Sequence, residues 1–140
     1  TASSIEPLRY AIEIRHPSFL CHEAIDLFRS HGVALALADT AGIWPYTEDI
    51  TADFVYIRLH GAEQLYWSGY TPEMLDWWAR RIEAWRSGRE PVDARRVAGP
   101  APAARQRDIY VYFDNDAQVR APFDAIALAK RLGVNGAGLL

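Results

Sequence analysis

Charged side chains of both signs close two apolar segments of the sequence, and such residues could transfer protons or bind an anion. Glu13 and Arg15 close one segment, and Arg58 and His60 close another. Side chains alternate along a strand, so each pair shares one face if these segments are strands. Burying a charge costs several kcal/mol unless the charge is paired, so these faces should border a polar space. The sequence therefore predicts a functional site at these strand ends.

Acid–base chemistry is the reaction class that these residue types favour, because carboxylates and imidazole exchange protons with substrates. The candidate catalytic residues are Glu13, His60 and Asp114. The candidate binding residues are Arg15, His16, Asp39, Arg58, Gly61, Tyr70, Asn115 and Asp116. Guanidinium groups beside carboxylates favour an anionic or polyhydroxylated ligand. They would repel a cation, so no metal ligands are predicted, although a divalent metal ion stays open as an alternative cofactor.

Each of these residues also has a purely structural interpretation. Glu13 and Arg58 could neutralise each other as an internal ion pair, and His16 could simply shape the turn that follows it. Asp39 could cap a turn, and the segment 114–116 could cap the helix after it. The sequence leaves these alternatives open.

Three classes of function fit these residues. The first is an enzyme that binds a phosphorylated or sugar-like small molecule at the strand ends. The second is glycoside hydrolysis by two carboxylates, Glu13 with Asp114 or Asp39, which would have to lie roughly 5–9.5 Å apart. The third is a domain that binds a ligand or a protein partner without catalysis. In that case the aromatic side chains of segment 66–70 could form a contact surface, although they could equally form a lid.

Strands and helices are predicted to alternate along the chain, which is typical of a parallel α/β sheet. The four predicted strands are 9–15, 33–38, 53–59 and 108–113, and the predicted helices are 21–31, 71–87 and 122–132. The second helix has the clearest pattern, with Thr71 as N-cap, Pro72 at its first position and Gly88 beyond its end. Segment 39–52 is expected to be an irregular loop, and segment 88–107 a flexible insertion.

Composition argues against several classes of function. The chain has 140 residues, enough for a single domain over 1–140. Its net charge of −3, from 15 basic and 18 acidic residues, makes nucleic acid an unexpected partner. No apolar run approaches the ~20 residues of a membrane span. Cys21 is the single cysteine, which fits a reducing compartment, so a cytoplasmic location with no membrane partner is expected.

Three motifs resemble those of the YecE-like proteins, the family called domain of unknown function 72. Segment 13–19 resembles the first signature of that family, segment 53–61 the second, and segment 110–116 the third. Asp39-Thr40 matches a shorter step between the first two. The resemblance covers nearly the whole chain, over residues 10–132.

The resemblance implies a TIM-type (β/α)8 barrel in a family whose biochemical role is not established. The four predicted strands would be the last four of eight, and a full barrel takes about 250 residues, so the chain is expected to be a fragment that lacks the N-terminal half. Many members have Asn-Asn where this chain has Asp114-Asn115, which changes the charge of that loop. Half a barrel has open sheet edges, which invite pairing with another chain. Besides a small-molecule ligand, the expected partners are therefore a second copy or a separate N-terminal half.

Overall fold

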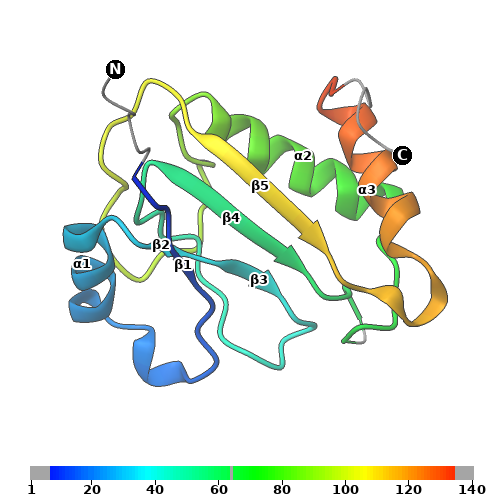
Figure 1. Cartoon of the computed structure of the whole chain (residues 1–140), viewed down its shortest axis with the longest axis horizontal. Coiled ribbons are helices and arrows are strands. Elements are labelled where there is room, and N and C mark those ends of the chain that lie inside the picture. Colours follow the sequence, from blue (N-terminus) through cyan, green and yellow to red (C-terminus); the bar gives the residue numbers. More distant parts are fainter. Residues whose placement is uncertain (1–6, 64, 135–140) are drawn as a thin grey trace, which may run out of the picture.

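The computed structural model describes residues 7–63 and 65–134, and this part of the chain has a mixed α/β fold (Figure 1). Its elements are β1 (Ala11–Ile12), α1 (His22–His31), β2 (Ala34–Leu35), β3 (Leu37–Asp39), β4 (Phe54–Leu59), α2 (Pro72–Arg86), β5 (Asp108–Phe113) and α3 (Ala121–Arg131). Two 3-10 helices, η1 (Pro17–Phe19) and η2 (Asp116–Gln118), follow β1 and β5. None of the helices in the described ranges has the length and apolar character to cross a lipid bilayer. The predicted α/β class is confirmed.

The strands pair in parallel and form a two-stranded sheet, β1–β2, and a three-stranded sheet, β3–β4–β5. The prediction of four strands is wrong here, because the second predicted strand is divided between the two sheets. The Ala36 N–H donates to the carbonyl of Ile12 (2.9 Å) and so continues the ladder with β1. On the other side of β2, the Thr51 hydroxyl accepts the Leu35 N–H (2.7 Å) and donates to the Val33 carbonyl (2.6 Å). Thr51 thus occupies the edge that β4 would otherwise pair with, so pairing with β4 begins only at β3.

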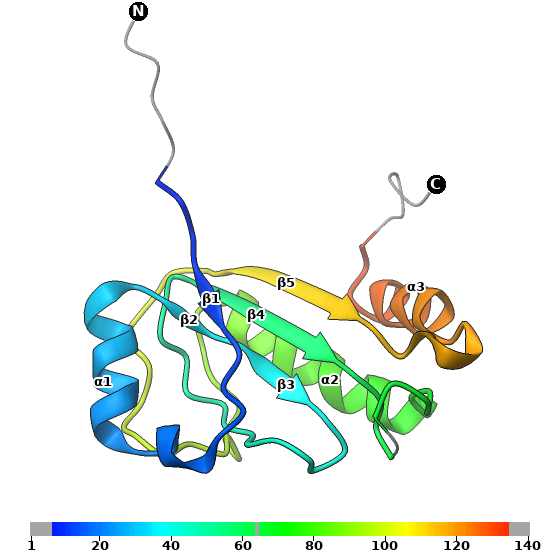
Figure 2. The same ribbon diagram turned by 60° about the horizontal axis from the view of Figure 1, so that its bottom comes forward.

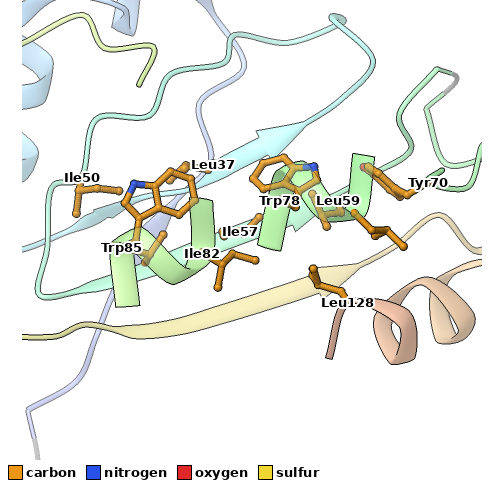
Figure 3. Packing of buried hydrophobic residues seen from close by; sticks show 11 residues of the cluster. Leu37, Ile50, Ile57, Leu59, Tyr70, Trp78, Ile82, Trp85 and Leu128 are labelled. Carbon is orange, nitrogen blue, oxygen red and sulfur yellow. The ribbon is translucent and has the colours of Figure 1, made fainter. Parts of the chain in front are cut away.

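The larger hydrophobic core lies between the three-stranded sheet and the helices α2 and α3, which cover one face of it (Figure 2). The stripe of α2 that packs against the sheet consists of Leu75, Trp78, Ile82 and Trp85, and each is at most 3% exposed. On β4 the alternate side chains Ile57 and Leu59 point to the same core (Figure 3), and Val55 belongs to it as well. Leu128 of α3 closes the cluster beside β5. The helical stripe that the sequence spacing predicts is therefore the core-facing side of α2.

The opposite face of the three-stranded sheet carries aromatic and charged side chains. Tyr56 of β4 stacks on Tyr112 of β5 with ring centroids 5.2 Å apart, and Phe54 meets Tyr110 edge-on at 5.9 Å. Tyr110 and Tyr112 are 39% and 50% exposed, and no helix of the described chain lies over this face (Figure 2). Parallel sheets are ordinarily covered on both faces. We call this uncovered face of the three-stranded sheet the open face.

Two buried carboxylates attach the segment 88–107 to the connection that follows β3. The carboxylate of Glu48 accepts the N–H of Arg95 (2.6 Å), and that of Asp49 accepts the N–H of Val97 (2.8 Å). Both acidic residues are fully buried. These bonds hold the middle of the segment in place, and the flexibility of the segment as a whole stays a prediction.

Candidate functional site

The carboxyl ends of the parallel strands bring most of the predicted site residues to one edge of the sheet. Backbone hydrogen bonds continue just past the strands: the N–H of His60 donates to the carbonyl of Asp39 (3.0 Å), and that of Asp114 to the carbonyl of Leu59 (3.1 Å). The ends of β3, β4 and β5 are therefore aligned along the same edge of the sheet. Glu13, just beyond β1, joins them from the neighbouring sheet.

His60 is the centre of the group of side chains that we call the ion cluster, which consists of Glu13, Arg15, Arg58, His60 and Asp114. Its ring is fully buried, and Nε2 is hydrogen-bonded to Oε2 of Glu13 at 3.1 Å. On the other side of the ring, Nδ1 lies 2.9 Å from Oδ2 of Asp114. That second contact lacks hydrogen-bond geometry, so we regard it as a close electrostatic contact only. The imidazole is therefore positioned by two carboxylates from different strand ends.

Two arginines neutralise the same two carboxylates. Arg58 lies 3.5 Å from Oε2 of Glu13 through Nη1 and is hydrogen-bonded to Asp114 through Nη2. Arg15 contacts the other oxygen of Glu13, through Nε at 3.1 Å and Nη2 at 3.0 Å. Its guanidinium also stacks over the ring of Trp44, 3.8 Å from the centroid. The charges of the two carboxylates and the two guanidinium groups therefore sum to zero, before any charge on His60 is counted.

The pKa of Glu13 shows which of these influences prevails. Burial by itself raises the pKa of this carboxyl, whereas the hydrogen bonds from His60 and Arg15 and the charge of Arg58 lower it. The net result is a pKa below the ordinary value of 4.5. Glu13 is therefore an ionised carboxylate at neutral pH, which is the form that accepts a proton.

Three further predicted residues form a second layer beside the ion cluster. The hydroxyl of Tyr70 accepts the N–H of Gly61 (3.2 Å), and Gly61 has a φ of 123°, which a side chain would disfavour. Burial raises the pKa of Asp39, although the Tyr70 hydroxyl and the N–H of Ala41 favour its ionised form. Tyr70 is itself buried, and burial and the charge of Asp39 raise the pKa of its hydroxyl far above the ordinary value. This layer supports the loop behind His60.

The remaining predicted residues lie outside the ion cluster. Asn115 is fully buried and donates to the carboxylate of Asp124 (2.9 Å), which also accepts the N–H of Tyr70 (3.2 Å). Asn115 therefore ties two loops together. Asp116 is exposed at the start of η2, and His16 is exposed at the N-cap of η1, where its ring accepts the N–H of Ser18 (3.2 Å).

A hollow of about 430 Å³ on the open face of the sheet adjoins the ion cluster. Glu13 and Arg58 are the two members of the cluster that line it. The other lining residues are Arg9, Ala11, Ala36, Phe54, Tyr56, Tyr110 and Tyr112. Because the side chain of His60 is fully buried, a ligand in this hollow would meet Glu13 and Arg58 and not the imidazole.

Trp44 and Asp124 contribute to this region and were not predicted. Trp44 contacts the ring of His60 edge-on (centroids 5.9 Å apart), as does Tyr66 on another side (5.4 Å). Trp44 lies in an irregular loop, where no periodicity indicates which way a side chain points. Asp124 lies in the first turn of α3, where an acidic residue is ordinarily explained by the helix dipole. Across the described ranges, no group of three or more metal-ligating side chains converges, so the geometry adds nothing in favour of the metal alternative.

Comparisons with known proteins agree on one family. The family described as protein of unknown function DUF72 matches residues 2–139. A solved DUF72 family protein from Thermotoga maritima MSB8 is 24% identical with a TM-score of 0.71, over 91% of this chain and 47% of that one. A DUF72 family protein from Enterococcus faecalis V583 is 15% identical with a TM-score of 0.68, over 96% of this chain and 53% of that one.

The chain thus spans about half the length of these solved structures, which at such identities indicate a shared fold. The comparison with curated proteins gave no match. The resemblance seen in the strand-end motifs is confirmed, and the chain belongs to the DUF72 family of proteins of unknown function.

Proposed function

We propose that this chain is the C-terminal half of a TIM-type barrel and that the hollow beside the ion cluster is part of an enzyme active site for a small anionic or sugar-like molecule. Four features support the barrel: parallel strands, helices on one face, an open opposite face, and solved relatives of about twice the length. In TIM barrels the active site lies at the carboxyl ends of the strands. The ion cluster occupies that position.

One observation carries the proposal: a fully buried imidazole is held between carboxylates from two strand ends, and one of these, Glu13, also lines the hollow. Glu13 is the general base, because it lines the hollow and is ionised at neutral pH. His60 is a positioning residue that orients Glu13 from behind. Arg58 lines the same hollow and binds the anionic group of the substrate.

Carboxylate-pair glycoside hydrolysis is the less favoured chemistry. Glu13 and Asp114 contact opposite nitrogens of the same imidazole and the same guanidinium. A sugar could not lie between the two carboxylates without displacing His60 or Arg58. Proton abstraction by a single carboxylate needs no such rearrangement.

The experiment is a titration of the protein with inorganic phosphate, glucose 6-phosphate and glucose, followed by thermal unfolding. Phosphate compounds at ten times their Kd should stabilise the protein by about 1.4 kcal/mol, whereas glucose alone should have a smaller effect.

Arg58→Lys should weaken phosphate binding, because lysine cannot form a bidentate contact. Glu13→Gln should bind phosphate at least as tightly, since a negative charge is removed. Arg105→Lys, on an exposed arginine outside the hollow, is the matched control. Equal binding by the Arg58 and Arg105 variants, or no binding of either phosphate compound, would refute the anion site.

A second candidate function is a cytoplasmic domain that binds a protein partner without catalysis. The exposed tyrosines of the open face favour it, because contiguous exposed aromatic surface marks interaction sites. In both functions the open face is covered by a second copy or by a separate N-terminal half. Size-exclusion chromatography with light scattering tests this coverage, and a well-behaved monomer of 15.8 kDa with a sharp thermal transition would contradict it.

A further inference from the structure

A small pocket lies between α2, the loop after β3 and the segment 88–107, and none of the described residues that line it also lines the hollow of the proposed active site. Its volume is about 240 Å³. Four aromatic side chains form its walls: Trp44, Tyr46, Trp77 and Trp78. Asp39 and Arg95 contribute its charged groups.

The pocket exists because the connection between β3 and β4 contains no helix. Ala41 and Gly42 form a tight turn with φ values of 52° and 77°. The Thr40 hydroxyl then accepts the N–H of Trp44 (3.0 Å), which fixes the position of that residue. A crossover helix would fill the space beside α2, whereas this irregular loop leaves part of it empty.

The aromatic walls are held by contacts with one another and with Arg81, which is not among the residues that line the pocket. Trp77 and Trp78 meet at a right angle with centroids 5.0 Å apart, and Tyr46 meets Trp78 at 6.4 Å. The guanidinium of Arg81 lies over the ring of Trp77, 3.9 Å from its centroid. Such fixed rings offer edges and faces to another aromatic ring with little loss of conformational freedom.

The charged groups differ in how well they are partnered. Asp39 accepts the N–H of Ala41 (3.4 Å). Arg95 is anchored through its main chain to Glu48. Within the two described ranges, its guanidinium has no hydrogen bond or ion pair, although its charge acts weakly on Asp93. An unpaired guanidinium at the rim of an aromatic pocket is suited to a carboxylate.

We infer that this pocket binds a single-ring aromatic carboxylate with a hydroxyl or amino group at the far end of the ring. The carboxylate pairs with Arg95, the ring lies among the four aromatic walls, and the hydroxyl or amino group donates to Asp39. The volume lies below the roughly 300–1,000 Å³ of drug-sized sites, which limits the ligand to one ring.

The test is an NMR titration of the full chain with 4-hydroxybenzoate, benzoate and cyclohexanecarboxylate, following the indole N–H signals of the five tryptophans. The signals of Trp44, Trp77 and Trp78 should shift, and those of Trp67 and Trp85 should not. 4-Hydroxybenzoate should bind more tightly than benzoate, because its hydroxyl adds a hydrogen bond to Asp39 that benzoate cannot make. Cyclohexanecarboxylate should bind most weakly, because it lacks the aromatic ring.

Arg95→Ala should weaken the binding of 4-hydroxybenzoate about tenfold. Arg105→Ala, which removes an exposed arginine of the same segment, should leave it unchanged. Arg58→Lys should also leave it unchanged, because Arg58 lines the other hollow. No shift of the three signals up to about 10 mM, or equal affinities of the Arg95 and Arg105 variants, would overturn the inference. A loss of binding in the Arg58 variant would overturn it as well, since the ligand would then lie beside the ion cluster.

Discussion

Charge compensation among a few side chains decides which residue of the ion cluster can meet a substrate. His60 has the residue type most often used for proton transfer, yet its side chain is fully buried behind Glu13. Glu13 is stabilised in its ionised form by its imidazole and guanidinium partners. The same contacts that orient the carboxylate therefore make its charge part of the stability of the fold.

Glu13→Gln should lower the free energy of unfolding by about 1 kcal/mol at neutral pH, because the amide keeps the shape but loses the charge that Arg15 and Arg58 neutralise. The folded pKa of Glu13 lies below 4.5, so its contribution is complete above that pH and is lost as the pH falls through the folded value. Urea unfolding of both proteins across this range should show the difference shrinking on acidification. A difference that persists at the lowest pH would show that charge is not its cause.

Asp39→Asn should have the opposite effect. Burial raises the pKa of Asp39, so ionisation of this carboxyl costs stability once the pH rises above its ordinary value of 3.8. The asparagine variant avoids that cost and should unfold at a higher temperature than the wild type at neutral pH, with the gain disappearing below pH 3.8. Asp53→Asn, at a side chain that is 81% exposed, is the control and should change little. A less stable Asp39 variant at neutral pH would mean that its bonds to Tyr70 and Ala41 outweigh burial.

The sequence could predict which residues gather at the strand ends but not which of them face the hollow. Alternation along β4 places Arg58 on the open face, and His60 follows directly after the last residue of β4. Whether His60 is covered depends on Trp44 and Tyr66, which come from two irregular loops. Loop conformations are set by contacts between distant residues, and no local pattern in the sequence records them.

Elements with strong local signals were predicted to within a residue or two. The structure has α2 at Pro72–Arg86 for a prediction of 71–87, and β5 at the predicted residues 108–113. The first predicted strand, 9–15, contracts to Ala11–Ile12, because only these residues are paired with β2. The second predicted strand is divided because the hydroxyl of Thr51 binds its backbone, and Thr51 is distant from that strand in the sequence.

Glycine at the end of α2 provides a test of how tightly the segment 88–107 returns to the helix. A Cβ at Gly88 would lie 2.0 Å from the carbonyl oxygen of Ala104, and the φ of Gly88 is 76°. Gly88→Ala should therefore cost more than 2 kcal/mol, since backbone must move. Gly32→Ala has a similar φ of 61° but nothing within 4 Å, so it should cost about 1 kcal/mol. Urea unfolding measures both, and equal losses would mean that the contact with Ala104 relaxes freely.

At the scale of the whole molecule, the open face is the surface that the proposed barrel would cover. Tyr110 and Tyr112 are exposed there, and β1 and β5 have no second partner strand within the described ranges. Open strand edges and exposed aromatic rings both favour association. The open face and the free strand edges are therefore the surfaces at which we expect a partner to bind.

Tyr112→Lys should weaken the proposed association with a second copy, because it puts a charge on a face that this copy would bury. Val92→Lys, at a fully exposed valine outside the open face, should leave the mass unchanged. Light scattering over a range of protein concentrations gives the mass of each variant. Association that is equally strong in both variants would place the contact on another surface.

The register of the longest ladder also has a kinetic consequence. β5 pairs with β4 over six positions whose partners lie 54 residues apart, as Phe54 does from Asp108, whereas β3 and β4 pair over a separation of 20. Closing the longer loop costs about 0.9 kcal/mol more conformational entropy than closing the shorter one. We therefore expect β3 and β4 to pair early in refolding and β5 to join them last. Pulsed amide labelling would show this order as earlier protection of β3 and β4, and simultaneous protection of all three strands would contradict it. During synthesis on the ribosome, α2 would emerge before β5, so part of its apolar stripe would stay exposed until residue 113 had emerged.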